Sequence, residues 1–330
     1  MKPAHSKKAI SMKKHNICIL GGTGFVGQSL AAGLVKQGHS VRLLCRRRER
    51  HRDLLVLPTV EIIKADIHDS KQLDLHFKGI DVVINLVGIL NEKRDNGKGF
   101  HHVHVALTEK IIAVCKANNI TRLLHMSALH ADAELAKSYY LKTKGLAEDL
   151  VHKETSLNVT SFRPSVIFGA RDSFTNRFAQ VLKITPLVFP LACPSSQFAP
   201  VYVEDVAQAF IHCIDDAQSY GQRYDLCGPR TYRLLELVHY VSDLSGHNRM
   251  IIGLDRVSSW LQANFFQYVP GKPFSRDNYR SLQTDSICNE GQNDLQNKLQ
   301  IKPTPLESVA PIYLGKSSPQ QHYQQYRKQH

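Results

Sequence analysis

Tyr140 and Lys144 have the side chains in this sequence best suited to acid–base chemistry. They lie four positions apart in a segment expected to be helical, so both would lie on one helix face. A phenol has a pKa of about 10, and a neighbouring ammonium lowers that pKa by favouring the phenolate. The pair therefore predicts proton transfer at Tyr140. The spacing alone is weak evidence, because Tyr268 and Lys272 repeat it where a proline and a glycine prevent a helix.

A second group of residues, in the segment GGTGFVG, could bind phosphate. Its glycines follow the apolar run 16–20 and precede an expected helix. Residues without a Cβ let the backbone approach a pyrophosphate, and the helix N-terminus offers free N–H groups. The segment predicts dinucleotide binding by Gly21, Thr23, Gly24, Phe25, Val26 and Gly27. The alternative is a glycine turn that only packs the helix on the strand.

The residues after the second expected strand indicate which dinucleotide is bound. An NAD site places Asp or Glu there to bind the ribose 2′-OH, whereas Arg46 and Arg47 occupy that place here. Guanidinium groups attract a 2′-phosphate, so NADP(H) is the preferred cofactor and NAD(H) the alternative. The arginines could instead form a solvated surface or contact acidic lipid. Asp66, after the third strand, would bind the adenine amino group or cap a helix.

Alternating strands and helices are expected to position these residues. Strands are expected over 16–20, 40–45, 60–65, 80–87, 122–127 and 159–163, and helices over 25–36, 100–117 and 138–152. The alternation predicts an α/β fold with a Rossmann-type, doubly wound parallel sheet. We expect a basic disordered arm over 1–15, an NAD(P)-binding Rossmann domain over 16–165, and a smaller C-terminal lobe over 166–330 that interleaves with it.

The net charge of +13 over 330 residues favours a polyanionic neighbour. Five lysines lie in the first 14 residues and could hold the chain loosely on an anionic membrane. No nucleic-acid-binding signature accompanies the basic runs, so nucleic acid is not an expected partner. His101, His102 and His104 cluster without a nearby Cys or acidic partner, so no metal site is expected and the imidazoles are predicted to pack beside the cofactor.

The seven cysteines are scattered and include no C-x-x-C pair, which predicts reduced thiols in a cytoplasmic protein. The sequence has no apolar run of about 18 residues, so no transmembrane helix is expected. The aromatic segment with Trp260, Phe265, Phe266 and Tyr268 is predicted to belong to the core of the smaller lobe. The alternative for that segment is a membrane-facing patch.

The motifs together resemble the extended short-chain dehydrogenase/reductase superfamily. GGTGFVG, the Tyr140/Lys144 pair and the segment 163–169 carry this similarity. Segments 85–90, 172–179, 200–207 and 224–229 are similar to its atypical branch, typified by the alpha-subcomplex accessory subunit (subunit 9 type) of respiratory complex I and its bacterial relatives. The resemblance covers residues 16 to 310. It implies bound NADP(H), with the nicotinamide ribose lined by Asn85, Leu86, Val87 and Gly88, and the nicotinamide ring near Pro164 and Val166.

One departure from the superfamily concerns the Ser or Thr that binds the substrate oxygen after the fifth strand. Ser127 is available but lies about two residues early, and Leu129 occupies the expected position. We expect an NADP(H)-dependent oxidoreductase, linked to quinone or isoprenoid metabolism, with Tyr140, Lys144 and Ser127 as catalytic residues. The first alternative is a non-catalytic, NADP(H)-bound accessory or assembly subunit docked on a respiratory complex at the inner face of the membrane. A sugar-nucleotide epimerase or dehydratase is the second.

Overall fold

A seven-stranded parallel sheet forms the centre of the computed structural model. The structure describes residues 13–315, so residues 1–12 of the expected basic arm lie outside the described residues. The strand order is β3-β2-β1-β4-β5-β6-β11. Every neighbouring pair is parallel, so the predicted doubly wound α/β sheet is confirmed. The strands are β1 Asn16–Leu20, β2 Ser40–Cys45, β3 Val60–Lys64, β4 Val82–Asn85, β5 Arg122–Met126, β6 Asn158–Pro164 and β11 Arg223–Leu226.

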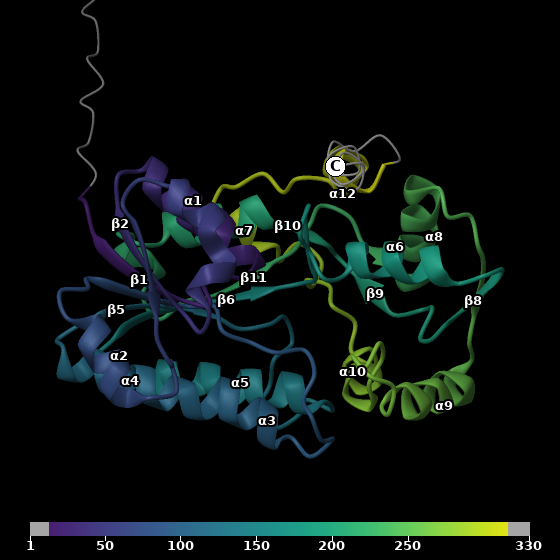
Figure 1. Ribbon diagram of the computed structural model, residues 1–330, viewed down its shortest axis with the longest axis horizontal. Coiled ribbons are helices and arrows are strands. Elements are labelled where there is room, and N and C mark those ends of the chain that lie inside the picture. The colour runs from purple at the N-terminus through teal and green to yellow at the C-terminus, as the bar shows by residue number, and fades with distance from the viewer. Residues whose placement is uncertain (1–12, 316–330) are drawn as a thin grey trace, which may run out of the picture.

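Helices cover both faces of this sheet (Figure 1). On one face α1 (Phe25–Lys36) packs beside α7 (Val203–His212), and on the other lie α2 (Ser70–Phe77), α4 (Leu107–Ala117) and α5 (Tyr139–Lys153). Side chains of a strand alternate between the faces. Ile17 and Ile19 of β1 therefore join the core under α1, whereas Cys18 and Leu20 join the core under α2 and α4. Burial on both sides explains why these strands are continuous apolar runs.

Two expected elements have different boundaries in the structure. The helix expected over 100–117 begins earlier, as α3 (Lys98–His101), continues through a π-helical turn (His102–Ala106) and becomes α4. The strand expected over 80–87 is only β4, because the chain turns away after Asn85, whose Oδ1 accepts the N–H of Val87 at 3.1 Å. Short 3₁₀ helices also occur at Arg48–Val56 and Ala217–Ser219.

The smaller lobe consists of three two-stranded sheets and short helices around a separate core. Helix α7 packs on the large sheet and strand β11 belongs to it, although both come from the second half of the chain, so the smaller lobe interleaves with the large sheet. The domain boundary at residue 165 stays a prediction. The strand pairs are β7 (Ile167–Phe168) with β10 (Val201–Tyr202), β8 (Val188–Leu191) with β13 (Met250–Gly253), and β9 (Gln197–Phe198) with β12 (Tyr232–Arg233). The remaining helices are α6 Thr175–Ile184, α8 Leu234–Ser245, α9 Arg256–Phe266, α10 Arg276–Ser281, α11 Asp294–Asn297 and α12 Leu306–Leu314.

A disulfide joins Cys227 and Cys288, so the expectation that the thiols are all reduced is wrong. The two residues are 61 positions apart, and sequence spacing gave no sign of the pairing. They meet because the segment before Cys288 runs beside β9, where Ala199 N–H donates to the Ser286 carbonyl at 3.0 Å. The other five cysteines are free and buried.

Glu148 ties helix α5 to two strands of the large sheet. Its carboxylate is 1% exposed and accepts hydrogen bonds from Arg163 of β6, with Nη2 at 2.6 Å, and from Arg223 of β11 at 2.5 Å. A carboxylate this deeply buried is tolerated only because both guanidinium groups lie beside it. The interaction therefore holds α5 in place against the edge of the sheet.

We predict that Glu148→Ala lowers the free energy of unfolding by about 3 kcal/mol, because it leaves two partly buried guanidinium groups without their carboxylate. Urea denaturation followed by circular dichroism measures the change. Glu61→Ala is the control: Glu61 is 60% exposed and pairs with Arg42 at 3.0 Å, so its loss should cost less than about 1 kcal/mol. Equal losses in the two variants would contradict this role of Glu148.

Candidate functional site

The glycine turn after β1 lies in close contact with the end of β4. Gly21 has a φ of +77°, and a Cβ there would lie 3.2 Å from backbone atoms of Leu86 and Val87. A Cβ on Gly27 would lie 2.4 Å from the Cα of Gly22, so α1 could not sit this close to the turn with any other residue. The three elements meet only because these positions carry no side chain.

The N-terminus of α1 is left without a side-chain cap. Gly24 is the N-cap residue, in an extended conformation, and no side chain accepts a hydrogen bond from the first turn. The N–H groups there, at Phe25 and Val26, are available to an anion, and the positive end of the helix dipole favours one. A Cβ-free turn followed by an uncapped helix fits a dinucleotide pyrophosphate, and Thr23 lies within the same turn.

The expected specificity residues lie at the ends of the next two strands. Arg46 and Arg47 follow β2 directly and are exposed. Asp66 follows β3, is also exposed, and accepts the N–H of His68 at 2.9 Å. It does not cap α2, because Asp69 accepts the N–H of Lys71 in that role, so the helix-cap alternative for Asp66 is wrong.

The loop from Asn85 to Gly88 meets Lys144 of α5 at the carboxyl ends of β4 and β5. The ammonium Nζ donates to the carbonyls of Met126 at 2.9 Å and Val87 at 3.3 Å. A Cβ on Gly88 would lie 3.2 Å from Nζ, so glycine leaves room for the ammonium. Asn85 is buried and holds the loop through its hydrogen bond to Val87.

Lys144 is buried but keeps its charge near neutral pH. Burial lowers the pKa of its ammonium to about 8, and the carboxylate of Glu148 opposes that shift. An ammonium has three N–H donors, and the two carbonyls account for two of them. Both bonds hold the ammonium at the carboxyl ends of β4 and β5.

Tyr140 occupies the first turn of α5, with its ring packed edge-on against Phe100 and His104. We expected Lys144 to lower the pKa of its phenol. Instead, burial raises that pKa to about 12, while the ammonium bonds to the backbone carbonyls of β5 and the β4 loop. In this structure the phenol of Tyr140 is therefore protonated at neutral pH.

His104 is a neutral packing partner of Tyr140. Its Nε2 accepts the N–H of Ile89 at 3.2 Å, so the ring proton lies on Nδ1, which faces Thr143 Oγ1 at 2.8 Å. Burial lowers the pKa of His104 to about 2. Among residues 13–315, no group of three His, Cys, Asp or Glu side chains is placed to bind a metal ion.

The smaller lobe contributes a contact that the sequence analysis missed. Asp277 of α10 accepts the backbone N–H groups of Tyr139 at 2.7 Å and Tyr140 at 3.1 Å. Arg280 lies 3.5 Å from Asp277 and bonds to Asp95 at 2.7 Å. Asp277 thus caps α5 across 137 residues of sequence, which no local sequence pattern could predict.

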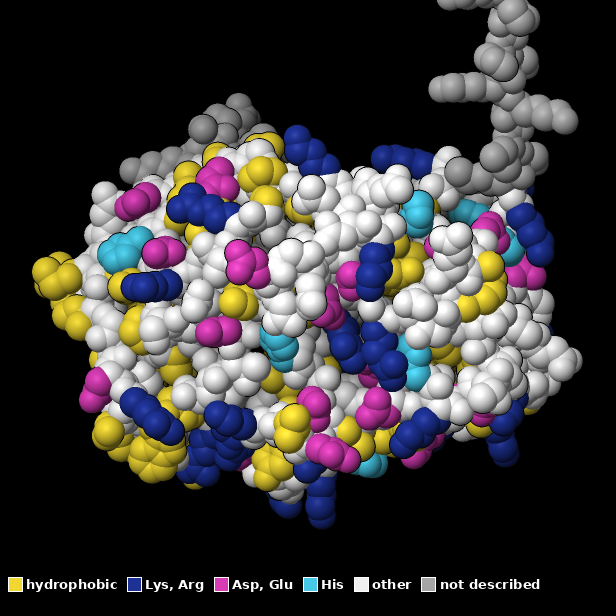
Figure 2. Space-filling model, turned by 180° about the vertical axis from the view of Figure 1, so that it is seen from behind, with side chains coloured by type: hydrophobic (Ala, Val, Ile, Leu, Met, Phe, Trp, Pro, Cys, Tyr) yellow, Lys and Arg dark blue, Asp and Glu magenta, His cyan; other side chains and the backbone are white. Residues whose placement is uncertain are grey.

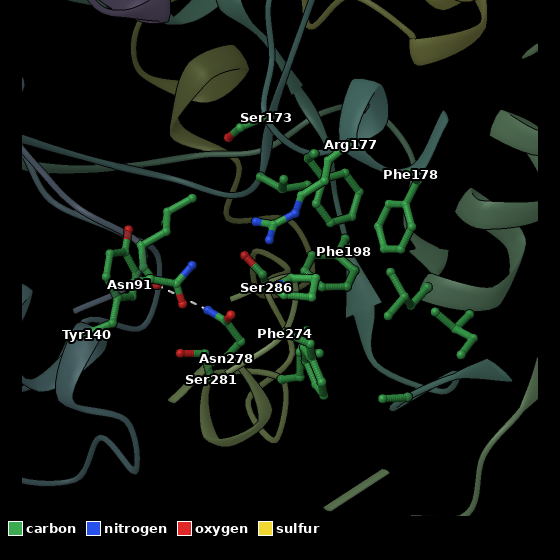
Figure 3. A pocket seen from close by; sticks show the side chains of 18 of the residues that line it. Asn91, Tyr140, Ser173, Arg177, Phe178, Phe198, Phe274, Asn278, Ser281 and Ser286 are labelled. Atoms are coloured by element: carbon green, nitrogen blue, oxygen red, sulfur yellow. Dashed lines mark hydrogen bonds between the residues drawn. The ribbon is translucent and has the colours of Figure 1, made fainter. Parts of the chain in front are cut away.

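A cavity of about 510 Å³ lies between the carboxyl edge of the sheet and the smaller lobe (Figure 3). Tyr140, Pro164 and Val166 line it from the sheet side, and its surface is mainly apolar. Figure 3 shows the guanidinium of Arg177, from α6, at this cavity; its Nη2 donates to the Lys272 carbonyl at 2.9 Å. Arg177 lies in the segment 172–179, whose local pattern indicates no role for this side chain.

Ser127 is not brought to this cavity. It is buried at the end of β5, its Oγ has no hydrogen-bond partner within the described part of the chain, and it is absent from the lining. Leu129 lines the cavity. The structure therefore places Tyr140 and Lys144 on one helix but does not bring Ser127 to the cavity beside Tyr140.

Comparisons with known proteins show relatives of two kinds. The chain is 31% identical over 232 residues to the mitochondrial NADH dehydrogenase [ubiquinone] 1 alpha subcomplex subunit 9 of Arabidopsis thaliana, a match that covers 68% of this chain but 57%, less than two thirds, of that protein. It is 30% identical over 198 residues to the ceramide reductase of Caulobacter vibrioides, covering 59% of each chain.

Two further comparisons concern the fold and the family. A nucleoside-diphosphate-sugar epimerase from Staphylococcus aureus superposes with a TM-score of 0.69 over 89% of this chain and 98% of its own; at 17% identity it shows the fold alone. The family model described as NAD(P)H-binding matches residues 21–217, more than half of the chain. With the uncapped glycine turn at the head of α1, that match shows that the chain belongs to the NAD(P)H-binding family of Rossmann-fold proteins.

Proposed function

We propose that this protein is an NADP(H)-dependent oxidoreductase that reduces a carbonyl group on an apolar substrate. The observation that carries the proposal is that Tyr140 lines the same cavity as Pro164 and Val166, together with Phe25, the first residue of α1 after the glycine turn. Figure 3 shows Tyr140 at this cavity. A proton donor and the expected position of the nicotinamide ring thus face one space. That space is large enough for a small organic substrate.

The reaction requires a hydride and a proton. NADP(H), when bound, would supply the hydride in reduction or accept it in the reverse direction. Tyr140 gives its phenolic proton to the carbonyl oxygen and recovers a proton from solvent. Its raised pKa keeps the phenol protonated, which suits the reductive direction. Lys144, held by the carbonyls of Met126 and Val87, would position a ribose hydroxyl through its third N–H.

The cavity wall supports an apolar substrate over a sugar nucleotide. Leu129, Phe174, Phe178 and Phe198 present hydrocarbon surface, and polar atoms make up the smaller part of the lining. The guanidinium of Arg177 would bind a polar or anionic end of the substrate. The similarity to a protein named ceramide reductase agrees with this substrate class. The epimerase and dehydratase alternatives find less support.

The non-catalytic alternative also has a specific observation in its favour. Leu129 lines the cavity where a Ser or Thr would bind the substrate oxygen, and Ser127 does not reach the space. Such a chain would carry NADP(H) as a structural component of a membrane respiratory complex. The similarity to a complex I accessory subunit supports this second candidate.

Gly24→Asp tests dinucleotide binding at the turn. An Asp at an N-cap stabilises a helix, and a Cβ there would meet only the Gly21 carbonyl oxygen, at 3.1 Å. Its carboxylate would, however, occupy the free N–H groups and repel phosphate. We expect the thermal midpoint to stay the same or rise while NADPH affinity falls by about a hundredfold or more. Fluorescence titration measures the affinity, with Gly24→Ala as the uncharged control; unchanged NADPH binding would place the pyrophosphate elsewhere.

Arg46→Ala/Arg47→Ala tests the choice of cofactor. Loss of two guanidinium groups from the expected 2′-phosphate site should weaken NADPH binding by about tenfold or more and leave NADH binding unchanged. Arg50→Ala/Arg52→Ala removes the same net charge farther along the chain and should change neither affinity strongly. Parallel titrations at one salt concentration decide the outcome. A loss of NADH affinity equal to that of NADPH would argue against a 2′-phosphate site.

Tyr140→Phe tests the proton donor. The phenylalanine ring keeps the packing on Phe100 and His104, so NADPH should bind as before while its oxidation by apolar ketones or short-tailed quinone analogues falls about a hundredfold or more. Tyr139→Phe is the matched control, since Tyr139 is partly exposed and absent from the cavity lining. Full activity in Tyr140→Phe would exclude Tyr140 as the donor. NADPH binding without turnover of any acceptor would favour the accessory role.

A further inference from the structure

Helix α9 has apolar side chains on two opposite faces. Ala263 is fully buried and Phe266 lines the cavity, so one face belongs to the interior. The other face exposes an apolar surface, which we call the α9 surface: Val257, Trp260, Leu261, Phe265 and, just past the helix, Tyr268. The spacing of these residues follows helical periodicity, so they form one stripe.

The expectation that this aromatic segment belongs to the core of the smaller lobe is therefore wrong for most of it. Trp260 is 51% exposed and Phe265 is 68% exposed, whereas Phe266 alone among these aromatic residues lines the cavity. The helix periodicity decides the matter, because Phe265 and Phe266 are adjacent and must point about 100° apart. Only one of them can face inward.

The smaller lobe exposes further apolar side chains on the paired strands β8 and β13. Val188, Met250 and Ile252 are exposed there. Gln262 of α9 donates to the Pro190 carbonyl of β8 at 2.8 Å, which joins the helix to these strands. More than half of the exposed large hydrophobic side chains within residues 13–315 lie in the segments 184–188 and 250–268.

The charges around this apolar region are mainly positive. Arg256, the first residue of α9, is exposed, and Arg276 lies over the ring of Tyr268 at 5.6 Å. Asp255 is the acidic residue at the start of α9, where it caps the helix by accepting the N–H of Ser258 at 2.9 Å. Figure 2 shows hydrophobic and basic side chains gathered together at the lower left, the end of the molecule that carries α9.

We propose that the α9 surface docks on an anionic lipid bilayer. Interfacial helices combine aromatic and aliphatic side chains, which enter the headgroup region, with basic side chains that meet anionic lipid. A contiguous apolar stripe of this kind is unusual on a protein that stays in water. Within the described residues no helix is long and apolar enough to cross a membrane, so the contact is peripheral.

The docking proposal is independent of the proposed reaction, but it bears on how substrate reaches the cavity. Phe266 lines the cavity from the inner face of the helix whose outer face would lie on lipid. A helix is about 10 Å across. The cavity therefore lies one helix diameter from the proposed bilayer surface, which suits a substrate that dissolves in lipid.

The single tryptophan of the chain lies on the α9 surface and makes the test direct. The full chain is mixed with vesicles of phosphatidylcholine containing phosphatidylglycerol, and Trp260 emission is recorded with and without brominated lipid. We expect a blue shift, quenching by the bromine atoms, and weaker binding to vesicles of phosphatidylcholine alone.

Leu261→Ser/Phe265→Ser should lower the vesicle partition coefficient by at least about tenfold, because two apolar side chains no longer enter the lipid. Leu75→Ser is the matched control. Leu75 is 58% exposed, close to the 55% of Leu261, but lies on α2 at the opposite end of the molecule (Figure 1). The control should bind vesicles as the unaltered chain does.

Four results would overturn the proposal. The first is no vesicle binding at any salt concentration, and the second is an equal loss in the Leu75 control. The third is sedimentation with vesicles while Trp260 emission stays unchanged, which would assign the contact to another part of the chain; deletion of residues 1–12 then tests the basic segment. The fourth is Trp260 emission that is already blue-shifted and protected from iodide without lipid. That would mean that a second copy, or another part of the same chain, covers the surface.

Discussion

The site depends on one constraint: the strands that follow β1 and β4 in the chain are added on opposite sides of the boundary between these two strands. The strand order places β2 and β3 on one side of β1, and β4, β5, β6 and β11 on the other, so the loops that follow β1 and β4 diverge at the carboxyl edge. The crevice between them is narrow enough that a Cβ on Gly21 would lie 3.2 Å from the backbone after β4. Every residue assigned to the cofactor lies on this edge because parallel strands all end there.

Contacts at three positions along helix α5 hold the helix in place, and they give Tyr140 a defined position. Glu148 bonds to the strands through Arg163 and Arg223, and Lys144 bonds to the carbonyls of Met126 and Val87. Asp277, from the smaller lobe, caps the first turn. Each contact is a buried or half-buried charge that needs its partner, so displacement of the helix would leave several charges unpaired.

The smaller lobe forms much of the cavity wall that faces the carboxyl edge of the shared sheet. Reductases and epimerases occur on this fold, so the fold alone does not determine the reaction. Here the lobe contributes phenylalanines and one guanidinium to the cavity, and its helix α9 carries apolar residues both inward and outward. The proposed apolar substrate and the proposed lipid contact both depend on the apolar side chains of this lobe.

The sequence by itself determined the six strands up to residue 163 and three of the helices between them, the glycine turn and the basic residues after β2, because these depend on local periodicity and on residues a few positions apart. Only the tertiary structure decided that Lys144 bonds to backbone carbonyls while burial raises the pKa of the Tyr140 phenol. It also decided that Arg177 lines the cavity and Ser127 does not, and that Cys227 pairs with Cys288. It also decided that Trp260 faces outward. These outcomes depend on contacts between residues far apart in the chain, and on the direction in which a packed helix faces, neither of which local spacing encodes.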